Sequence, residues 1–181
     1  LITQTGLHQP FPSIEMKLGS TRGTNALLER KGAKVAFLIT EGFKDLLLIG
    51  TQQRKELFAL QIVKEKPLYD SVIEVKERIA ANGKVLKPLD ENEILRLVSM
   101  IKNSGCDSIA IALLNSYKNP EHENALKAVL IKNGYQFVSD SHSLSGQIKI
   151  LQRAETTVAN AYLDPIIHSY INRIQEGLRD V

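Results

Sequence analysis

Three short stretches of this sequence concentrate hydroxyl, amide and charged side chains, and each could bind an anion or a small polar ligand. The first is the run from Ser20 to Asn25, Ser-Thr-Arg-Gly-Thr-Asn. Glycine lets backbone N–H groups approach a ligand, and arginine can hold a carboxylate or a phosphate through two parallel hydrogen bonds. A helix cap explains one hydroxyl of this run but not five polar side chains. We therefore expect the run to bind substrate or nucleotide through Thr21, Arg22, Gly23, Thr24 and Asn25.

The second stretch, residues 115–122, follows an apolar run that is typical of a buried strand. Its candidates for ligand binding are Ser116, Asn119 and His122. Asn119-Pro120 is also a common way to begin a helix, because the N–H group that proline lacks would have no partner there. Binding loops and capping loops have similar compositions, so both roles stay open for these residues.

The third stretch begins at Arg153 and lies in a helical pattern. Thr157 and Asn160 are three residues apart and Thr156 and Asn160 are four apart, so the three side chains share a face. Two threonines and an asparagine are rarely needed in a helix unless that face meets solvent, a partner or a ligand. Thr156, Thr157 and Asn160 are therefore binding candidates, with the solvent and partner alternatives open.

Hydrophobic periodicity indicates which elements position these stretches. Short apolar runs alternate with amphipathic segments, which favours an α/β fold with a mixed, largely parallel sheet flanked by helices. In such sheets ligands bind at the carboxyl ends of the strands, and we expect all three stretches to lie there. The predicted strands are 14–18, 34–40, 71–79, 108–114 and 137–139, and the predicted helices are 24–31, 43–50, 90–104, 120–133 and 154–178.

Local signals fix several boundaries of these elements. Asp90 is a suitable cap for the helix that follows it, and Gly105 ends that helix. Asn82-Gly83 is a strong hairpin signal, which predicts a small antiparallel insertion over about residues 70–88. Pro165 is expected to interrupt or bend the last helix. Residues 1–15 are expected to form an irregular lead-in, and residues 16–181 one domain.

Composition excludes several classes of function. A net charge of +3, with scattered lysines and arginines, does not favour nucleic-acid binding. No apolar window is long enough to span a bilayer and no signal peptide is visible, so neither a membrane nor secretion is expected and the predicted location is the cytoplasm. The single cysteine and the spacing of the histidines give no metal-ligand pattern, so we predict no metal site within this chain.

Several of these stretches also resemble one known family. Residues 19–32 are similar to the Gly-Thr-Thr-x-x-Thr-Asn-Ala-Leu-Leu-Glu-Arg-Lys-Gly stretch of the hydantoinase/oxoprolinase family. Residues 113–123 resemble its Leu-Leu-His-Ser-Tyr-x-Asn-Pro-x-His-Glu stretch, with Asn115 in place of the usual histidine. Residues 156–165 resemble its Thr-Thr-Val-x-Asn-Ala-Tyr-Leu-x-Pro stretch. The similarity extends from about Met16 to Leu178.

The resemblance implies part of an actin-like (ribonuclease H-like) ATPase architecture and an ATP-dependent hydrolase that opens a cyclic amide. The implied reaction is 5-oxoproline to glutamate or a hydantoin to an N-carbamoyl amino acid, with ATP and Mg²⁺ as cofactors and K⁺ as an open candidate. An acetone-carboxylase-like subunit and a non-catalytic interface domain of such an enzyme are the alternatives. Which residues would be catalytic stays unknown.

Members of the family begin with an Asp-x-Gly-Gly-Thr-Phe-Thr-Asp segment that this sequence does not contain. We therefore expect the chain to be an internal fragment of a longer enzyme and to be inactive alone. The expected partners are a small cyclic amide and either the remaining domains of the same enzyme or a second subunit. The full-length protein is expected to form a homo- or hetero-oligomer.

Overall fold

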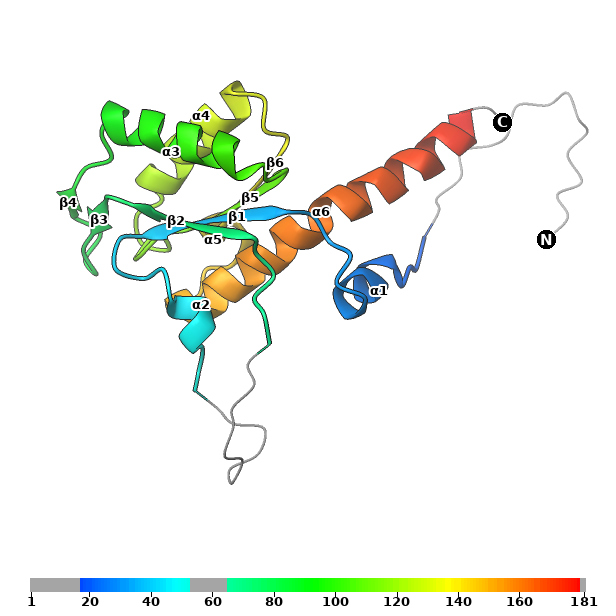
Figure 1. Cartoon of the computed structure of the whole chain (residues 1–181), viewed down its shortest axis with the longest axis horizontal. Helices are drawn as coiled ribbons and strands as arrows, with labels where there is room; N and C mark the ends of the chain where they lie inside the picture. Colours follow the sequence, from blue (N-terminus) through cyan, green and yellow to red (C-terminus); the bar gives the residue numbers. More distant parts are fainter. Residues whose placement is uncertain (1–16, 53–64, 180–181) are drawn as a thin grey trace, which may run out of the picture.

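A parallel four-stranded sheet with helices on both faces forms the centre of the molecule (Figure 1). The computed structural model describes residues 17–52 and 65–179. The strands are β1 (Val35–Thr40), β2 (Ser71–Val75), β5 (Ser108–Ala112) and β6 (Phe137–Asp140), in the order β2-β1-β5-β6. Every neighbouring pair is parallel, which confirms the predicted sheet.

Alternate residues of each strand face two separate hydrophobic cores, as the two-residue period of a strand requires. Ala36 and Leu38 of β1 face the core that is covered by α3 (Glu91–Ser104) and α4 (Glu121–Lys132). Phe37 and Ile39 face the opposite core, which is covered by α6 (Ile150–Arg179) and bordered by α2 (Leu46–Ile49). The two central strands, β1 and β5, are almost entirely apolar because both of their faces are buried.

Several predicted boundaries are confirmed by the hydrogen bonds that form them. The side chain of Asp90 accepts a 2.7 Å hydrogen bond from the backbone N–H of Glu93 and so caps α3. Gly105 ends that helix in the left-handed conformation, with a φ of 64°. α4 likewise stops at Asn133 and is followed by Gly134, whose φ is 91°.

Two predicted helices are shorter than expected. The helix predicted over 24–31 is α1 (Arg22–Leu28), which begins earlier and ends before Arg30, where the chain takes a φ of 54°. The helix predicted over 43–50 is only the single turn α2, because Gly42 and Gly50 have positive φ angles on either side of it. Helical spacing of apolar residues therefore overestimated both lengths.

The last helix is longer than predicted and is not interrupted at Pro165. It begins at Ile150 instead of residue 154 and runs for 30 residues. Proline cannot donate a hydrogen bond to the carbonyl four residues earlier, which is that of Ala161. The hydroxyl of Ser108 donates to this carbonyl instead, at 2.7 Å in the buried interior. A side chain of β5 thus supplies the hydrogen bond that Pro165 removes.

The predicted strand 71–79 is divided between two sheets. Residues 71–75 form β2 and pair with β1, whereas β3 (Arg78–Ile79) pairs with β4 (Val85–Lys87) as the predicted antiparallel hairpin. Lys76 and Glu77 make the break, and the Glu77 side chain turns into the protein. The predicted lead-in and residues 14–16 of the first predicted strand lie outside the described residues, and Lys17 and Leu18 are not in a strand.

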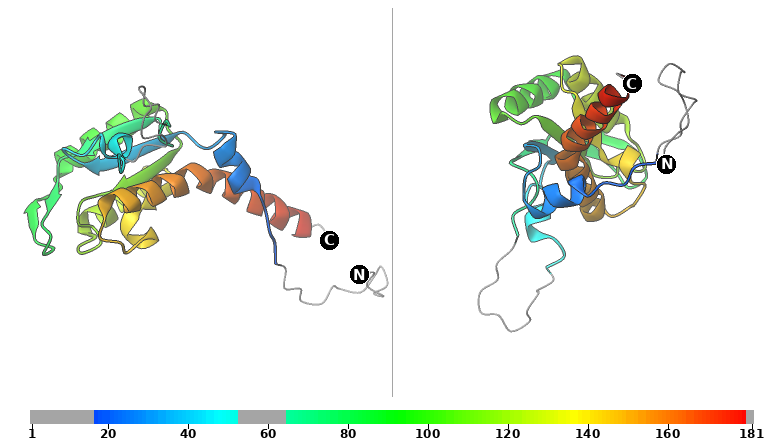
Figure 2. Two further views of the ribbon diagram at one scale, coloured as in Figure 1. Left: turned by 90° about the horizontal axis from the view of Figure 1, so that it is seen from below. Right: turned by 90° about the vertical axis from the view of Figure 1, so that its right-hand side faces the viewer.

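The remaining helices lie at opposite edges of the sheet (Figures 1 and 2). α5 (Ser141–Leu144) directly follows β6 at its carboxyl end. α1 precedes β1 and packs against the distal part of α6, which projects beyond the amino ends of the strands. No helix among the described residues is both long and apolar enough to cross a membrane.

Candidate functional site

The order of the strands identifies the carboxyl edge of the sheet as the place to look for a site. The chain passes from β1 to β2 on one side and then to β5 and β6 on the other. The loops after β1 and β5 therefore leave in opposite directions, and open α/β sheets bind ligands in the crevice at this switch point. Buried polar side chains gather under these loops in two connected groups.

Thr40, Glu77 and His122 make up the first group, between the ends of β1, β2 and α4. All three are buried, with exposures of 0%, 1% and 3%. The Thr40 hydroxyl donates to Glu77 Oε1 and accepts a 2.8 Å hydrogen bond from the backbone N–H of Leu114. Glu77 Oε2 lies 2.7 Å from His122 Nδ1. This group joins the ends of β1 and β5 to the segment that leads into the hairpin.

Arg153 is the centre of the second group, and none of its side chain is exposed. Its guanidinium donates to the hydroxyls of Ser116 and Ser141 through Nη1 and to the Leu113 carbonyl through Nη2, the last at 2.9 Å. Burial lowers the pKa of Arg153, although the charge of Glu123 opposes this shift. The Ser141 hydroxyl donates to Glu123 at 2.7 Å and so links the two charged groups.

Glu123, Asp140 and His142 bring three ligand-type groups within 4.8 Å of one another. The carboxylate oxygens of Glu123 and Asp140 already accept several hydrogen bonds. Glu123 accepts from the backbone N–H of His142 at 2.9 Å, and Asp140 pairs with the ammonium group of Lys127. Burial alone would raise the pKa of Asp140, but the hydrogen bonds from Lys127 and Ser143 and the nearby positive charges outweigh it and lower that pKa. Hydrogen bonds and ion pairs account for the cluster without a bound cation.

The β3–β4 hairpin is attached to this edge through side-chain amides. Asn115 Nδ2 donates to the Ile79 carbonyl at 2.8 Å, and Asn119 Nδ2 donates to the Gly83 carbonyl at 3.0 Å. Arg78 Nη2 donates to the Glu41 carbonyl at 2.9 Å. Asn115 adopts a positive φ of 60°, which asparagine tolerates better than most residues. The second predicted stretch therefore holds the hairpin in place and also contributes residues to the candidate site.

The structure separates the predicted stretches. Ser116, Asn119 and His122 lie at the carboxyl edge, and Ser116 meets Arg153 of the third stretch there. The first stretch does not lie at this edge, so that expectation is wrong. α1 comes directly before β1 in the chain, so it lies at the amino end of that strand and not at the carboxyl end.

The side chains of the first stretch are mostly exposed at the amino edge. Thr21, Thr24 and Asn25 are exposed, and Gly23 lies against Ile167 of α6. The Arg22 guanidinium stacks over the ring of Tyr170 at 5.1 Å from its centre. Their assignment as ligand-binding residues stays a prediction.

The three residues of the third stretch do not share one environment. Thr156 is exposed, and its hydroxyl bonds to the Gln152 carbonyl at 2.9 Å. Thr157 is buried and bonds to the Arg153 carbonyl at 2.7 Å, whereas Asn160 donates to the Ser139 hydroxyl at 3.0 Å. Helical spacing placed them side by side, but the hydroxyls bond to their own helix. A binding role for them stays a prediction.

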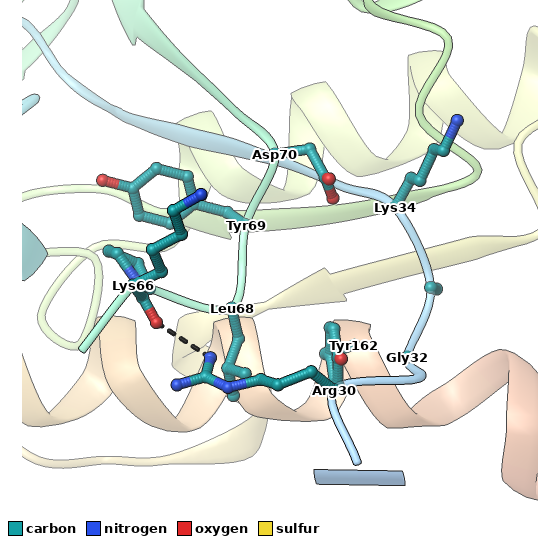
Figure 3. A pocket seen from close by; sticks show the side chains of 10 residues that line it. Arg30, Gly32, Lys34, Lys66, Leu68, Tyr69, Asp70 and Tyr162 are labelled. Carbon is teal, nitrogen blue, oxygen red and sulfur yellow. Dashed lines mark hydrogen bonds between the residues drawn. The ribbon is translucent and has the colours of Figure 1, made fainter. Parts of the chain in front are cut away.

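A cavity of about 450 Å³ opens at the amino edge, where the sequence analysis assigned no residue (Figure 3). Arg30 and Lys66 border it, and Arg30 Nη1 donates to the Lys66 carbonyl at 2.8 Å. Gly32 lies so close to Tyr162 that a Cβ atom would sit 2.0 Å from the tyrosine ring. This contact joins the first and the third stretch of the family resemblance.

The spacing of buried residues could have pointed to the site residues that sequence analysis missed. Glu77 continues the two-residue alternation of Ile73, Val75 and Ile79, all of which are buried, so its carboxylate falls on the buried side of this run. Glu123 precedes the buried Leu126 and Leu130 by three and seven residues, which is the spacing of one helix face. Nothing local indicates that Thr40 bonds to Glu77.

The fold and this edge define a doubly wound α/β domain with a buried, charged hydrogen-bond network at the carboxyl ends of its strands. The chain belongs to the hydantoinase/oxoprolinase N-terminal region family, whose sequence profile matches residues 12–134.

Named relatives cover nearly the whole chain. The 5-oxoprolinase of Saccharomyces cerevisiae is 38% identical in an alignment of 190 positions that covers 90% of this chain but only 15% of the yeast protein. The acetophenone carboxylase gamma subunit of Aromatoleum aromaticum is 31% identical over 93% of this chain and 25% of its own length. The crystal structure of the ATP-dependent caprolactamase from Pseudomonas jessenii matches with a TM-score of 0.74 and 32% identity, over 87% of this chain and 23% of that one.

Proposed function

We propose that this chain is part of an ATP-dependent enzyme that opens a cyclic amide, with 5-oxoproline as the first candidate substrate and a hydantoin as the second. The similarity to proteins named 5-oxoprolinase and ATP-dependent caprolactamase, over about nine tenths of the chain, carries this proposal. Both names describe ATP-dependent or lactam-directed chemistry on a ring amide. The chain spans a small part of each relative, so the proposal concerns the longer protein in which such a domain works.

The chemistry explains why ATP is needed. An unstrained lactam is a poor electrophile, because resonance stabilises the amide bond. Phosphorylation of the amide oxygen makes the carbonyl carbon open to attack by water. Phosphoryl transfer depends on positioning and on neutralising charge, for which Mg²⁺ is the proposed ion and K⁺ a further candidate. The phosphates of ATP would be held by segments outside this chain, in an actin-like arrangement.

In this proposal the chain supplies one wall of the active-site cleft. The carboxyl edge of the sheet contributes His122 and the loops held by Arg153. The alternative location for the ligand is the amino edge, at the opposite ends of the strands, where Arg22 and Thr24 of the first stretch are proposed to bind the anion or the lactam, with Thr21 and Asn25 orienting them. Arg22 is exposed and has a defined position over Tyr170, which supports its availability to a ligand. Arg22→Ala in the longer enzyme should raise the KM for 5-oxoproline about tenfold or more, and an unchanged KM would remove this assignment.

The test is ADP release by the longer enzyme with Mg²⁺ and K⁺, with and without 5-oxoproline. Release that depends on 5-oxoproline and is matched by glutamate supports the proposal. Release that depends only on a hydantoin moves the protein to the related ring-opening reaction. If neither 5-oxoproline nor a hydantoin causes ADP release, the proposal is contradicted. Omission of each cation in turn tests the proposed ions. The 181-residue chain alone is expected to release no ADP.

A second candidate comes from the carboxylase relative. Similarity to the acetophenone carboxylase gamma subunit favours a subunit that acts with others on a different carbonyl compound. Bicarbonate-dependent ADP release with a ketone would distinguish it. In either case the proposed partners are further domains or a second subunit, and the proposed location is the cytoplasm. A purely structural interface domain predicts instead that variants at both edges leave turnover unchanged.

A further inference from the structure

His122 has one ring nitrogen fixed by a buried acid and the other nitrogen free. Its side chain is 4% exposed, and Nδ1 lies 2.7 Å from Glu77 Oε2. Nε2 makes no hydrogen bond to any residue that the structure describes. Among the described residues, the fully buried side-chain nitrogen and oxygen atoms without a hydrogen-bond partner do not include Nε2. Because Nε2 has no partner, it must belong to the small exposed part of the ring.

The surroundings of Glu77 fix which nitrogen carries the proton. The Glu77 side chain is fully buried, and its second oxygen accepts the hydroxyl proton of Thr40. Thr40 is fixed in turn by the backbone N–H of Leu114. A carboxylate only accepts hydrogen bonds, so the ring nitrogen that faces it must be Nδ1–H. In the neutral ring Nε2 then presents a lone pair, as in a histidine that acts as a base.

We propose that His122 is the proton-transfer residue of the carboxyl-edge site and that Glu77 and Thr40 are positioning residues that fix its tautomer. This inference rests on the proposed function. When water attacks the carbon that bears the phosphorylated oxygen, its oxygen forms the new C–O bond, the C=N electron pair moves to the ring nitrogen and one water proton passes to Nε2. The imidazolium returns this proton to the ring nitrogen as the C–N bond breaks and its electron pair stays on that nitrogen, while the remaining hydroxyl re-forms a C=O bond and loses its proton to solvent, from which the amine takes its second proton. Glu77 stabilises the imidazolium between the two steps. The product is an acyl phosphate, which a second water hydrolyses to the carboxylate and inorganic phosphate.

The pair also has a structural consequence that the test must separate from catalysis. Glu77 lies between β2 and the hairpin, so its bond to His122 helps to anchor the hairpin. Anchoring needs only a donor at the position of Nδ1. Asparagine places an amide N–H near that position but has nothing at the position of Nε2. His122→Asn therefore keeps the anchoring bond and removes the proton acceptor.

The first experiment measures 5-oxoproline-dependent ADP release by the longer enzyme. His122→Asn should lower kcat about 100-fold or more, the usual effect of losing a general acid–base residue, with KM changed less than about threefold. Glu77→Gln should lower kcat about tenfold or more, because the amide no longer fixes the tautomer. The matched controls His168→Asn and Glu121→Gln change exposed residues outside the network and should leave kcat within about twofold. A His122→Asn enzyme that keeps a third of its kcat overturns the proposal.

The second experiment needs no turnover. Nitrogen-15 NMR of the 181-residue chain at about pH 8, where histidine rings are mostly neutral, reports which ring nitrogen of His122 is protonated. The expected result is Nδ1–H in the wild-type chain and a loss of this preference in Glu77→Gln. An Nε2–H ring in the wild type overturns the proposal even if the enzyme is active. Absence of lactam-dependent ADP release in the wild-type enzyme instead overturns the proposed function, and the catalytic role with it, whatever the tautomer.

Discussion

Replacing Gly32 with alanine should destabilise the domain through a single steric conflict. The new Cβ would lie 2.0, 2.1 and 2.3 Å from Cε1, Cζ and Cδ1 of the Tyr162 ring. The two backbones cannot simply separate, because the N–H of Ala33 donates to the Tyr162 carbonyl at 3.0 Å. Ordinary contact begins near 3.4 Å, so the ring has to move by more than an ångström. Tyr162 is 7% exposed and lies on the face of α6 that packs in the core against the sheet.

The size of the effect follows from the two ways of relieving this conflict. Overpacking that the core absorbs costs about 1–3 kcal/mol, whereas expelling a large aromatic ring costs about 3–5 kcal/mol. We therefore expect Gly32→Ala to lower the free energy of unfolding by about 3 kcal/mol. At about 2–4 °C per kcal/mol for a domain of this size, the melting temperature should fall by about 6–12 °C.

Thermal melts followed by circular dichroism, with urea titrations for the free energy, measure this change. Gly146→Ala is the matched control, because a Cβ there meets nothing within 4 Å, and it should cost less than about 0.5 kcal/mol. In a Tyr162→Ala background the ring is absent, so the added cost of Gly32→Ala should disappear. A Gly32→Ala chain that melts within about 2 °C of the wild type, or an equal cost in the Tyr162→Ala background, refutes the steric argument.

Three further changes test other parts of the structure. Ser108→Ala should cost about 1–3 kcal/mol by leaving the Ala161 carbonyl without a donor, and Pro165→Ala should reduce this cost in urea titrations by restoring a backbone N–H. Asp90→Ala should cost about 1 kcal/mol by removing the cap of α3, whereas Asp90→Asn should stay close to the wild type. The pKa of Asp140 is lower in the folded state, so its stabilisation is complete above the unfolded value of about 4 and is lost as the pH falls through the folded value. Asp140→Asn should therefore flatten the loss of stability in acid melts, and an unchanged acid slope would contradict the shift.

Sequence predicted the elements whose signals are local. Residues 109–112 are all apolar, so both faces of this run are apolar and a buried strand was its natural interpretation. Asp90, Gly105 and Asn82-Gly83 act within a few residues of themselves, and each does what its position predicts. The error at the last helix arose because a distant residue intervenes. Pro165 was expected to interrupt or bend the last helix. It does not interrupt α6, because the hydroxyl that replaces the missing N–H comes from Ser108 of β5, 57 positions before Pro165 in the chain.

The candidate site was predictable only in part, for the same physical reason. His122 and Ser116 were found because they follow a recognisable strand, but their partners come from other elements. Glu77 bonds to His122 across 45 residues and Arg153 bonds to Ser116 across 37. Such pairs depend on which loops the strand order brings together. Their only local sign was the place of Glu77 on the buried side of an alternating run.

The 30-residue helix α6 has a mechanical consequence. Arg153 near its beginning holds the loops after β5 and β6, Tyr162 nine residues later is locked against Gly32, and the rest extends away from the sheet with α1 beside it (Figure 2). The helix is continuous across Pro165 and about 45 Å long, although it curves along its length (Figure 2). A single element thus connects the Gly32–Tyr162 contact at the amino edge with the Arg153 guanidinium that holds the loops at the carboxyl edge, so the two edges of the sheet are mechanically coupled.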